Sequence, residues 1–199
     1  MNGTEIKEAL SLLSRVLEHG DGEARGKTSL IVCGGAALVA RSLVQRVTKD
    51  VDVVAMMRNG ELVSPAPLPA SLLVAAEKVA VGMNLPKDWL NNGPSSGDGG
   101  LFQIGLPDGL EDRMEEHKFG DMLSVFFVGR LDQICFKLYA AVDQMGSYHG
   151  QDLEKLEPSL EELIFAITWV KKHDSSEGFL VMLEHYLSEN GYEKAIRYI

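Results

Sequence analysis

The spacing of hydrophobic positions along this chain predicts a mixed α/β protein. Three apolar runs rich in β-branched and aromatic residues predict buried strands, at residues 30–33, 51–55 and 122–128. Apolar residues at three- and four-residue spacing predict helices, at residues 4–19, 36–45, 72–82, 132–144, 160–172 and 176–190. Residues 61–63 and 89–91 are candidate short strands. We therefore expect a small mixed sheet flanked by helices, followed by a helical C-terminal region.

The length of the chain sets the expected domain organisation. With 199 residues, of which 45% are hydrophobic, the chain can bury one sizeable core. We assign residues 1–150 to this α/β core and residues 151–199 to a helical region packed on it. Ser159 and Glu162 match the S-x-x-E pattern of a capping box at the start of the helix predicted at residues 160–172.

A strand, a turn and a second strand at residues 29–55 carry the candidate chemistry. Gly34 and Gly35 end the first strand, and Asp50 and Asp52 stand at the start of the second. Because side chains alternate across a strand, both carboxylates project from one side, roughly 7 Å apart. Charges taken out of water cost free energy unless they are paired or bind a cation. The pair therefore suits a divalent metal ion, and the Gly-Gly turn before a helix suits a phosphate group.

These residues resemble a known family. Gly34-Gly35, a helix and Thr48-x-Asp50-x-Asp52 resemble the signature of the DNA polymerase beta-like nucleotidyltransferases. The longer string that begins at Arg46 is similar to the branch of AbiEii-type toxins and related uncharacterised bacterial proteins. The resemblance implies a nucleotidyltransferase-like core. It also implies that Asp50 and Asp52 are catalytic and hold magnesium (Mg) or manganese (Mn), and that the nucleotide is bound by Gly34, Gly35, Arg46 and Thr48.

The resemblance extends to two residues further along the chain. The toxin-like branch has a lysine on a comparable helix, followed by an acidic position, and Lys137 and Asp152 are similar to these. It implies that Lys137 is a catalytic and nucleotide-binding residue that neutralises phosphates, and that Asp152 belongs to the same nucleotide site. The alternative for Lys137 is a surface lysine whose stem lies along apolar neighbours. The alternative for Asp152 is a helix cap.

The resemblance is incomplete at the third apolar strand, and this leaves several interpretations. In the family a strand near the Asp-x-Asp strand usually brings a third carboxylate, but residues 122–128 contain none and Asp121 stands only at their entrance. The first interpretation is transfer of a nucleotidyl group from a nucleoside triphosphate to an unknown acceptor, which is a protein, an RNA end or a small molecule. The second is an inactive relative that senses nucleotides or binds a partner in a toxin–antitoxin-like system, as a homodimer or with an antitoxin-type partner. In a third, Asp50 and Asp52 are merely exposed acids.

The amino-acid composition limits the partners and the cellular compartment that we expect for this protein. The net charge of −10 and a pI near 5.0 oppose extended binding to DNA or RNA, which relies on Lys and Arg. No apolar run approaches the ~18–20 residues of a membrane span, and the polar N-terminus lacks a signal-peptide pattern. Cys33 and Cys135 lie in apolar segments, so we expect buried thiols and a cytoplasmic protein. Residues 91–100, rich in Gly and Ser, are either a mobile flap or, as we favour, an exposed connection.

Overall fold

The computed structural model describes residues 1–20 and 26–199, which form two compact units. The first unit comprises Met1–Leu106 and Glu111–Val128, and the second comprises Pro107–Leu110 and Gly129–Ile199. The second unit therefore begins before residue 150, where the sequence places the end of the core, because the helix that starts at residue 130 packs with later helices. The glycine-rich sequence of residues 20–27, GDGEARGK, predicts a loop, and residues 21–25 of it lie outside the described residues.

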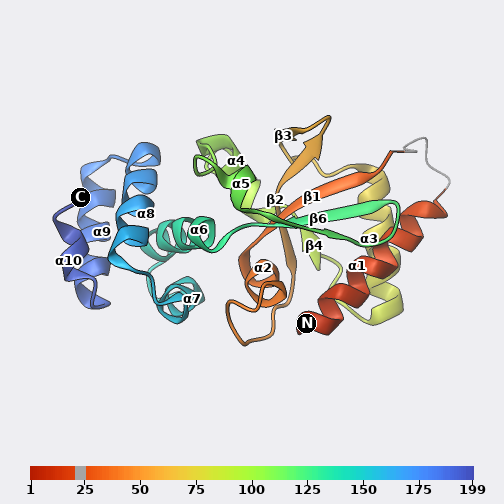
Figure 1. Ribbon diagram of the computed structural model, residues 1–199, viewed down its shortest axis with the longest axis horizontal. Coiled ribbons are helices and arrows are strands. Elements are labelled where there is room, and N and C mark those ends of the chain that lie inside the picture. The colour runs from red at the N-terminus through yellow and green to blue at the C-terminus, as the bar shows by residue number, and fades with distance from the viewer. Residues whose placement is uncertain (21–25) are drawn as a thin grey trace. The chain divides into compact units, whose positions relative to one another are not determined.

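A mixed sheet forms the centre of the first unit (Figure 1). Its strands are β1 (Thr28–Cys33), β2 (Val51–Arg58), β3 (Glu61–Val63), β4 (Leu90–Asn91), β5 (Glu115–Lys118) and β6 (Leu123–Phe127). The main path has the order β3-β2-β1-β6-β5, and β4 pairs with β2. The pairs β1–β6 and β2–β4 are parallel, and the others are antiparallel. The expected mixed α/β fold, with a sheet flanked by helices, is confirmed.

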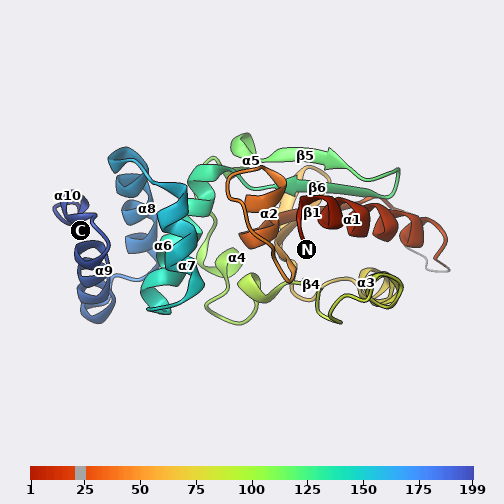
Figure 2. The same ribbon diagram turned by 90° about the horizontal axis from the view of Figure 1, so that it is seen from below.

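The central strands are those that the apolar runs predict. Leu30 on β1, Val53 on β2 and Val125 on β6 have no exposed surface. The sequence pattern does not predict β5, because its four residues, EEHK, show no apolar alternation. β5 lies at the edge of the sheet beside β6 (Figure 2), and its charged residues Glu115, Glu116 and Lys118 are exposed. An edge strand of this kind needs no apolar face, and its charges oppose pairing with another sheet.

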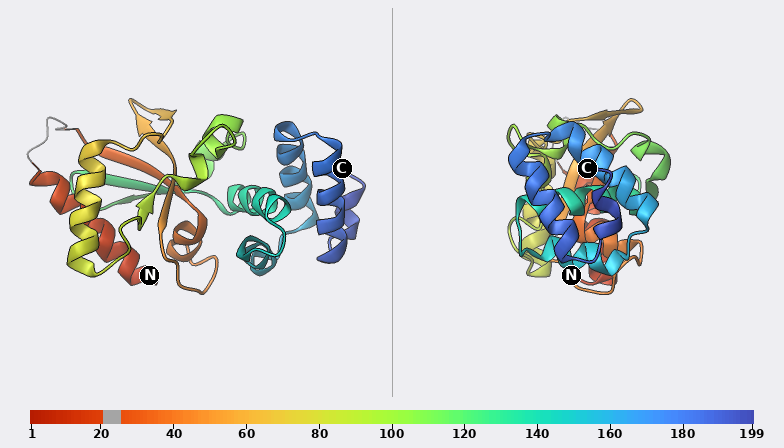
Figure 3. Two further views of the ribbon diagram at one scale, coloured as in Figure 1. Left: turned by 180° about the vertical axis from the view of Figure 1, so that it is seen from behind. Right: turned by 90° about the vertical axis from the view of Figure 1, so that its left-hand side faces the viewer.

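Two long helices pack against each other in the first unit, α1 (Gly3–Glu18) and α3 (Ala70–Met83) (Figure 3). α1 begins at Gly3, one residue before the predicted start at residue 4, because Asn2 caps it. The Asn2 side chain accepts hydrogen bonds from the N–H groups of Thr4 and Glu5, and the Glu5 carboxylate accepts one from the Asn2 N–H. Shorter helices lie in the connections, namely α2 (Gly34–Ala40), η1 (Gly93–Ser95), α4 (Leu101–Ile104) and α5 (Leu110–Arg113).

Helix α2 is shorter than the helix predicted at residues 36–45. It ends at Ala40, and Ser42 then takes a positive φ of 57°. The guanidinium of Arg41 donates hydrogen bonds to the carbonyl oxygens of Arg113 at 3.3 Å and Val128 at 3.0 Å. The helix itself is ended locally by a Schellman motif, in which the N–H groups of Ser42 and Leu43 donate to the carbonyl oxygens of Val39 and Leu38, although the apolar spacing continues to the buried Val44.

Residues 92–100 are anchored to the sheet at Ser95. Ser95 is fully buried, and its hydroxyl donates a hydrogen bond to the carbonyl oxygen of Val54 on β2 at 2.7 Å. The same hydroxyl accepts a hydrogen bond from the N–H of Phe102 at 3.3 Å. The expectation of an exposed connection is therefore wrong at Ser95, whereas the following residues Ser96 and Gly97 are exposed.

Helices build the second unit (Figure 1): α6 (Arg130–Asp143), α7 (Tyr148–Leu156), α8 (Leu160–His173), α9 (Glu177–Glu189) and α10 (Glu193–Ile196). α6 packs against α7, α8 and α9. The predicted capping box of α8 is confirmed, because Ser159 Oγ accepts from the Glu162 N–H at 3.2 Å and the Glu162 carboxylate accepts from the Ser159 N–H at 2.9 Å. Arg130 joins the end of α7 to the start of α8 by donating to the carbonyl of Leu156 and to the Glu162 carboxylate.

Two further expectations concern burial and membranes. Cys33 and Cys135 are buried thiols, as the sequence predicts. Within residues 1–20 and 26–199, no helix combines the length and the apolar character that crossing a bilayer requires.

Candidate functional site

The candidate site lies where β1 ends, at the Gly34–Gly35 turn. Gly34 has a φ of +65°, a conformation that residues with a Cβ rarely adopt. Cys33 lies opposite Asp52 in the antiparallel register of β1 and β2, which brings the Asp52 carboxylate against Gly34. A Cβ on residue 34 would lie 2.6 Å from Oδ2 of Asp52. Glycine is therefore required at this position both by the backbone and by the close approach of Asp52.

Arg46 and Thr48 cover the second glycine of the turn. A Cβ on the buried Gly35 would lie 2.6 Å from Nη2 of Arg46 and 2.6 Å from Oγ1 of Thr48. The turn thus has an acidic group against its first residue and a guanidinium and a hydroxyl against its second. The structure brings these residues together although ten residues or more separate the turn from Arg46 in the sequence.

Thr48 connects the turn to Asp50. Its hydroxyl donates to the carboxylate oxygen Oδ1 and to the main-chain oxygen of Asp50, at 3.2 Å in each case. The Thr48 N–H in turn donates to the carbonyl oxygen of Met1 at 2.9 Å. Residues 45–48 belong to no helix or strand, so these hydrogen bonds, rather than a sheet ladder, fix the approach to β2.

Asp50 and Asp52 flank Val51 at the start of β2. Val51 and Val53 are fully buried, whereas Asp50 and Asp52 are half-buried. This alternation matches the predicted arrangement with both carboxylates on one side of the strand. Two carboxylates fit a magnesium or manganese ion, since Mg²⁺ is usually bound through one or two carboxylates, with waters and substrate phosphates as further ligands. Among the described residues, no group of three His, Cys, Asp or Glu side chains forms a metal site.

Asn91, which belongs to none of the motifs in the sequence, lies beside Asp52. β4 pairs with β2 in parallel, and Asn91 is in register with Asp52. The amide of Asn91 is held at both ends, because Oδ1 accepts from the Gly93 N–H at 2.7 Å and Nδ2 donates to the Asp88 carbonyl at 3.4 Å. The only signal in the sequence is the short strand predicted at residues 89–91, and a strand of this length does not reveal its pairing partner.

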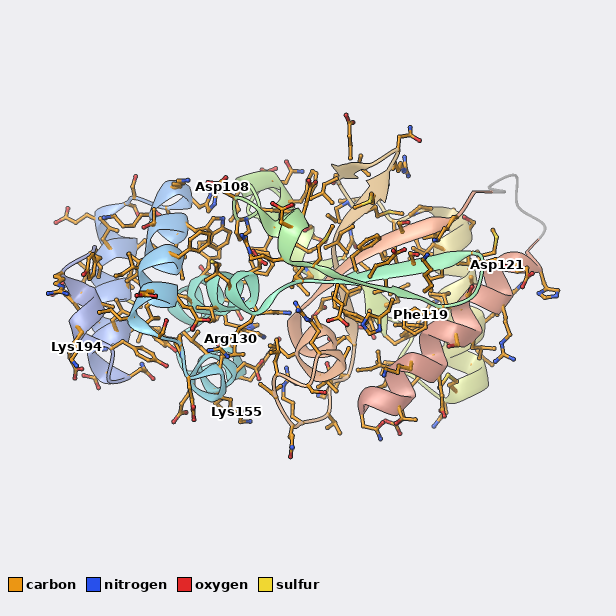
Figure 4. The ribbon with its side chains drawn as sticks, viewed as in Figure 1. Asp108, Phe119, Asp121, Arg130, Lys155 and Lys194 are labelled. Atoms are coloured by element: carbon orange, nitrogen blue, oxygen red, sulfur yellow. The ribbon has the colours of Figure 1, made fainter. Side chains whose placement is uncertain are left out.

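Asp121, the nearest candidate for a third carboxylate in the sequence, is remote from the turn. β6 runs parallel to β1, with Leu123 in register with Thr28 at the start of β1. Asp121 therefore lies near the start of β1, in the turn between β5 and β6 (Figure 4), whereas Gly34 follows the end of β1. At ~3.3 Å per residue, the length of β1 separates them by roughly 20 Å.

Lys137 and Asp152 meet in the second unit as a buried ion pair. The Lys137 ammonium lies 2.8 Å from Oδ2 of Asp152, and the two side chains are only 4% and 3% exposed. The ammonium also lies 3.3 Å from Nδ1 of His149 and 5.3 Å from the centre of the Tyr148 ring. The alternative that Lys137 is a surface lysine is therefore wrong. Asp152 is not a helix cap either, because it lies inside α7, whose N-cap is Ser147.

A scan against protein-family models matched none of them, and searches of curated proteins and of solved structures found no match to this chain. Function is therefore inferred from the residues and the geometry of the chain itself.

Proposed function

We propose that the chain is a metal-dependent nucleotidyltransferase, which moves a nucleotidyl group from a nucleoside triphosphate to an acceptor. The observation that carries this proposal is the convergence of the motif residues on one turn. Asp52 lies against Gly34, while Arg46 and Thr48 lie against Gly35. A ligand made of a divalent cation and a triphosphate needs acidic and basic groups side by side, and this turn supplies both.

Each side of the turn supports a different part of that ligand. The main-chain N–H groups of the Gly34–Gly35 turn would donate to phosphate oxygens, beside the side chains that occupy the space next to both glycines. Arg46 and Thr48 would add a guanidinium and a hydroxyl as donors to phosphate oxygens. Asp50 and Asp52 would hold the magnesium or manganese ion, which, when bound, stabilises charge on the phosphate oxygens.

The reaction asks the protein mainly for positioning and electrostatics. A nucleophilic group of the acceptor attacks the α-phosphorus and forms a bond to it, and the proton that this group loses passes to solvent. The bond from the α-phosphorus to the oxygen that bridges to the β-phosphorus breaks, and pyrophosphate leaves. The hydrogen bonds from Thr48 to Asp50 and the contact of Asp52 with Gly34 keep both acids in place beside the turn. The acceptor is a protein, an RNA end or a small molecule, and the net charge of −10 disfavours an extended nucleic acid.

Lys137 and Asp152 enter the proposal through the resemblance alone. It implies that the Lys137 ammonium neutralises nucleotide phosphates. In the second unit this ammonium is oriented by Asp152 and His149. The expected role of Asp152 is therefore to position the ammonium, and the nucleotide affinity of Lys137→Met/Asp152→Leu tests whether this ammonium contacts phosphate.

One observation favours a second candidate function. Within the described part of the chain, no third carboxylate joins Asp50 and Asp52. A relative without catalytic activity would bind the nucleotide through the same turn and act as a sensor or as a partner-binding member of a toxin–antitoxin-like system. Such a protein would form a homodimer or a complex with an antitoxin-type partner.

Nucleotide-dependent stability and labelled transfer together separate the two functions. A nucleoside triphosphate with millimolar Mg²⁺ or Mn²⁺ should raise the melting temperature, because ligands that bind only the folded state stabilise it. Asp52→Asn should abolish this shift, whereas Asp121→Asn, a matched change at the far end of β1, should leave it intact. Triphosphates labelled at the α-phosphate then report on transfer to protein, RNA or small molecules.

Each outcome has one meaning. Incorporation that depends on Asp52 supports the transferase. A shift that depends on Asp52 without incorporation into any acceptor class supports the nucleotide sensor. If metal and nucleotide leave the melting temperature of the wild-type protein unchanged, both functions are contradicted.

A further inference from the structure

We propose that Asn91 is a further residue of the metal site, and that its amide oxygen is a third donor to the divalent ion held by Asp50 and Asp52. The identity of the ion rests on the proposed function. The placement of Asn91 rests on the pairing of β4 with β2.

The strand register places Asn91 and Asp52 as direct neighbours. Adjacent strands lie about 4.7–4.9 Å apart, and residues in register on parallel strands project from the same face. Ligand oxygens at ~2.0–2.1 Å from an octahedral Mg²⁺ ion lie roughly 3 Å from each other. The side chains of Asn91 and Asp52 therefore need to converge only slightly for their oxygens to bind one ion.

The hydrogen bonds of Asn91 prepare its amide oxygen for this role. The Gly93 N–H takes one of the two acceptor positions of Oδ1, at 2.7 Å, and leaves the second for a ligand. Nδ2 donates to the Asp88 carbonyl, which fixes which end of the amide is the oxygen. The Asn91 side chain is half-buried, as are Asp50 and Asp52, so an ion from solvent can reach all three. Amide and carboxylate oxygens both suit Mg²⁺ and Mn²⁺.

A neutral third donor also has an electrostatic consequence. Asp50 and Asp52 already place two carboxylates beside one turn, and a third would increase their repulsion whenever the ion is absent. The Asn91 amide supplies an oxygen without adding charge. Changing Asn91 to aspartate should therefore couple stability to the metal more strongly than in the wild-type protein.

The test compares Asn91→Asp with Asn92→Asp and the wild-type protein by thermal unfolding and direct titration with Mn²⁺ in the absence of nucleotide. Asn91→Asp keeps an acceptor for the Gly93 N–H. Asn92 is the neighbouring asparagine and donates to the Pro65 carbonyl, so its replacement adds the same charge one residue away. We expect Asn91→Asp to melt lower than the wild type without metal and to recover with Mn²⁺, with Mn²⁺ affinity raised ~10-fold or more. Asn92→Asp should respond to Mn²⁺ as the wild type does.

Two further variants complete the test. The gain in Asn91→Asp should vanish in the double variant Asn91→Asp/Asp52→Asn, because the ion needs both strands. Asn91→Ser shortens the side chain without adding charge and so moves its oxygen away from the ion. This change should weaken Mn²⁺ binding several-fold. Equal Mn²⁺ responses of Asn91→Asp and Asn92→Asp would overturn the role of Asn91. A gain that depends on Asp52 supports it even if no nucleotide transfer is detected, so its failure and that of the proposed function are separate results.

Discussion

The carboxylate of Asp52 occupies the space that a side chain on residue 34 would need. Gly34 also has a positive φ, so a side chain there would meet a steric conflict and a strained backbone together. Gly35 differs, because a side chain there would meet the end of Arg46 and the hydroxyl of Thr48. The two glycines are therefore needed for packing within the protein as well as for the proposed approach of phosphates. A valine at position 35 would disturb the fold and ligand binding alike.

Replacement of Lys137 should destabilise the second unit. Lys137→Met removes the ammonium and leaves the Asp152 carboxylate buried without its ion-pair partner. Breaking a buried pair in this way costs about 3–5 kcal/mol. Lys137→Met/Asp152→Leu should recover most of this loss, because an apolar pair of similar volume avoids burying a charge. Urea unfolding measures both effects, with Lys155→Met as the control for an exposed lysine on α7 (Figure 4).

The double variant also tests the phosphate role of Lys137. We expect this variant to fold without the ammonium, so a nucleotide affinity weakened by about 1–3 kcal/mol would support a contact between that charge and phosphate. Wild-type affinity in this variant, at low and at high salt, would contradict the role that the resemblance implies. If Lys137→Met lost no more stability than Lys155→Met, this result would contradict the buried ion pair itself.

At the scale of elements, a single serine holds the connection after β4 on the sheet. Ser95→Ala removes the hydroxyl that donates to the Val54 carbonyl oxygen, and this buried oxygen then lacks that hydrogen bond. We expect the free energy of unfolding to fall by about 1–2 kcal/mol, the cost of a buried group without its partner. Ser96→Ala is the matched control, because Ser96 is exposed and bonds only the Asn92 carbonyl through its hydroxyl. Chemical unfolding of the two variants should separate them, and equal stabilities would mean that Ser95 is not an anchor.

The elements that sequence analysis predicts correctly are those whose cause is local. β1, β2 and β6 are continuous apolar runs, and the start of α8 follows from Ser159 and Glu162, three residues apart. β5, which it misses, depends on a distant contact, because β6 offers this strand its pairing partner. The early end of α2 is local, but Ser42 takes the left-handed conformation there in place of the glycine or asparagine that would signal a helix end.

The same distinction applies to the candidate site. The motif from Gly34 to Asp52 can be read from the sequence because its residues are close along the chain and have characteristic spacing. Asn91 cannot, because its position beside Asp52 depends on how two strands pair. The partner of Lys137 is likewise set by the packing of α6 against α7, whereas the resemblance points to Asp152 only as an acidic position after the lysine.

At the scale of the whole molecule, each unit carries its own spectroscopic reporter. The chain has two tryptophans. Trp89 is fully buried in the first unit, and its indole N–H donates to the Ala76 carbonyl at 2.9 Å. Trp169 is buried in the second unit against the rings of Phe136 and Tyr139. A Trp89→Phe background therefore reports unfolding of the second unit through Trp169 alone.

The acid stability of the second unit should depend on Glu162. Burial raises the pKa of Glu162, but hydrogen bonds from Arg130 and Ser159 outweigh burial and hold the pKa below the ordinary value of 4.5. A carboxyl group with a lowered pKa in the folded state contributes stability that is complete above the ordinary value and is lost as the pH falls through the folded value. In the Trp89→Phe background, the melting temperature reported by Trp169 should therefore fall as the pH drops below about 4.5. Glu162→Gln should lower it at neutral pH and flatten this fall. Glu161→Gln, an exposed change in the same first turn of α8, should preserve the profile, and an equally steep fall in both variants would remove Glu162 as its cause.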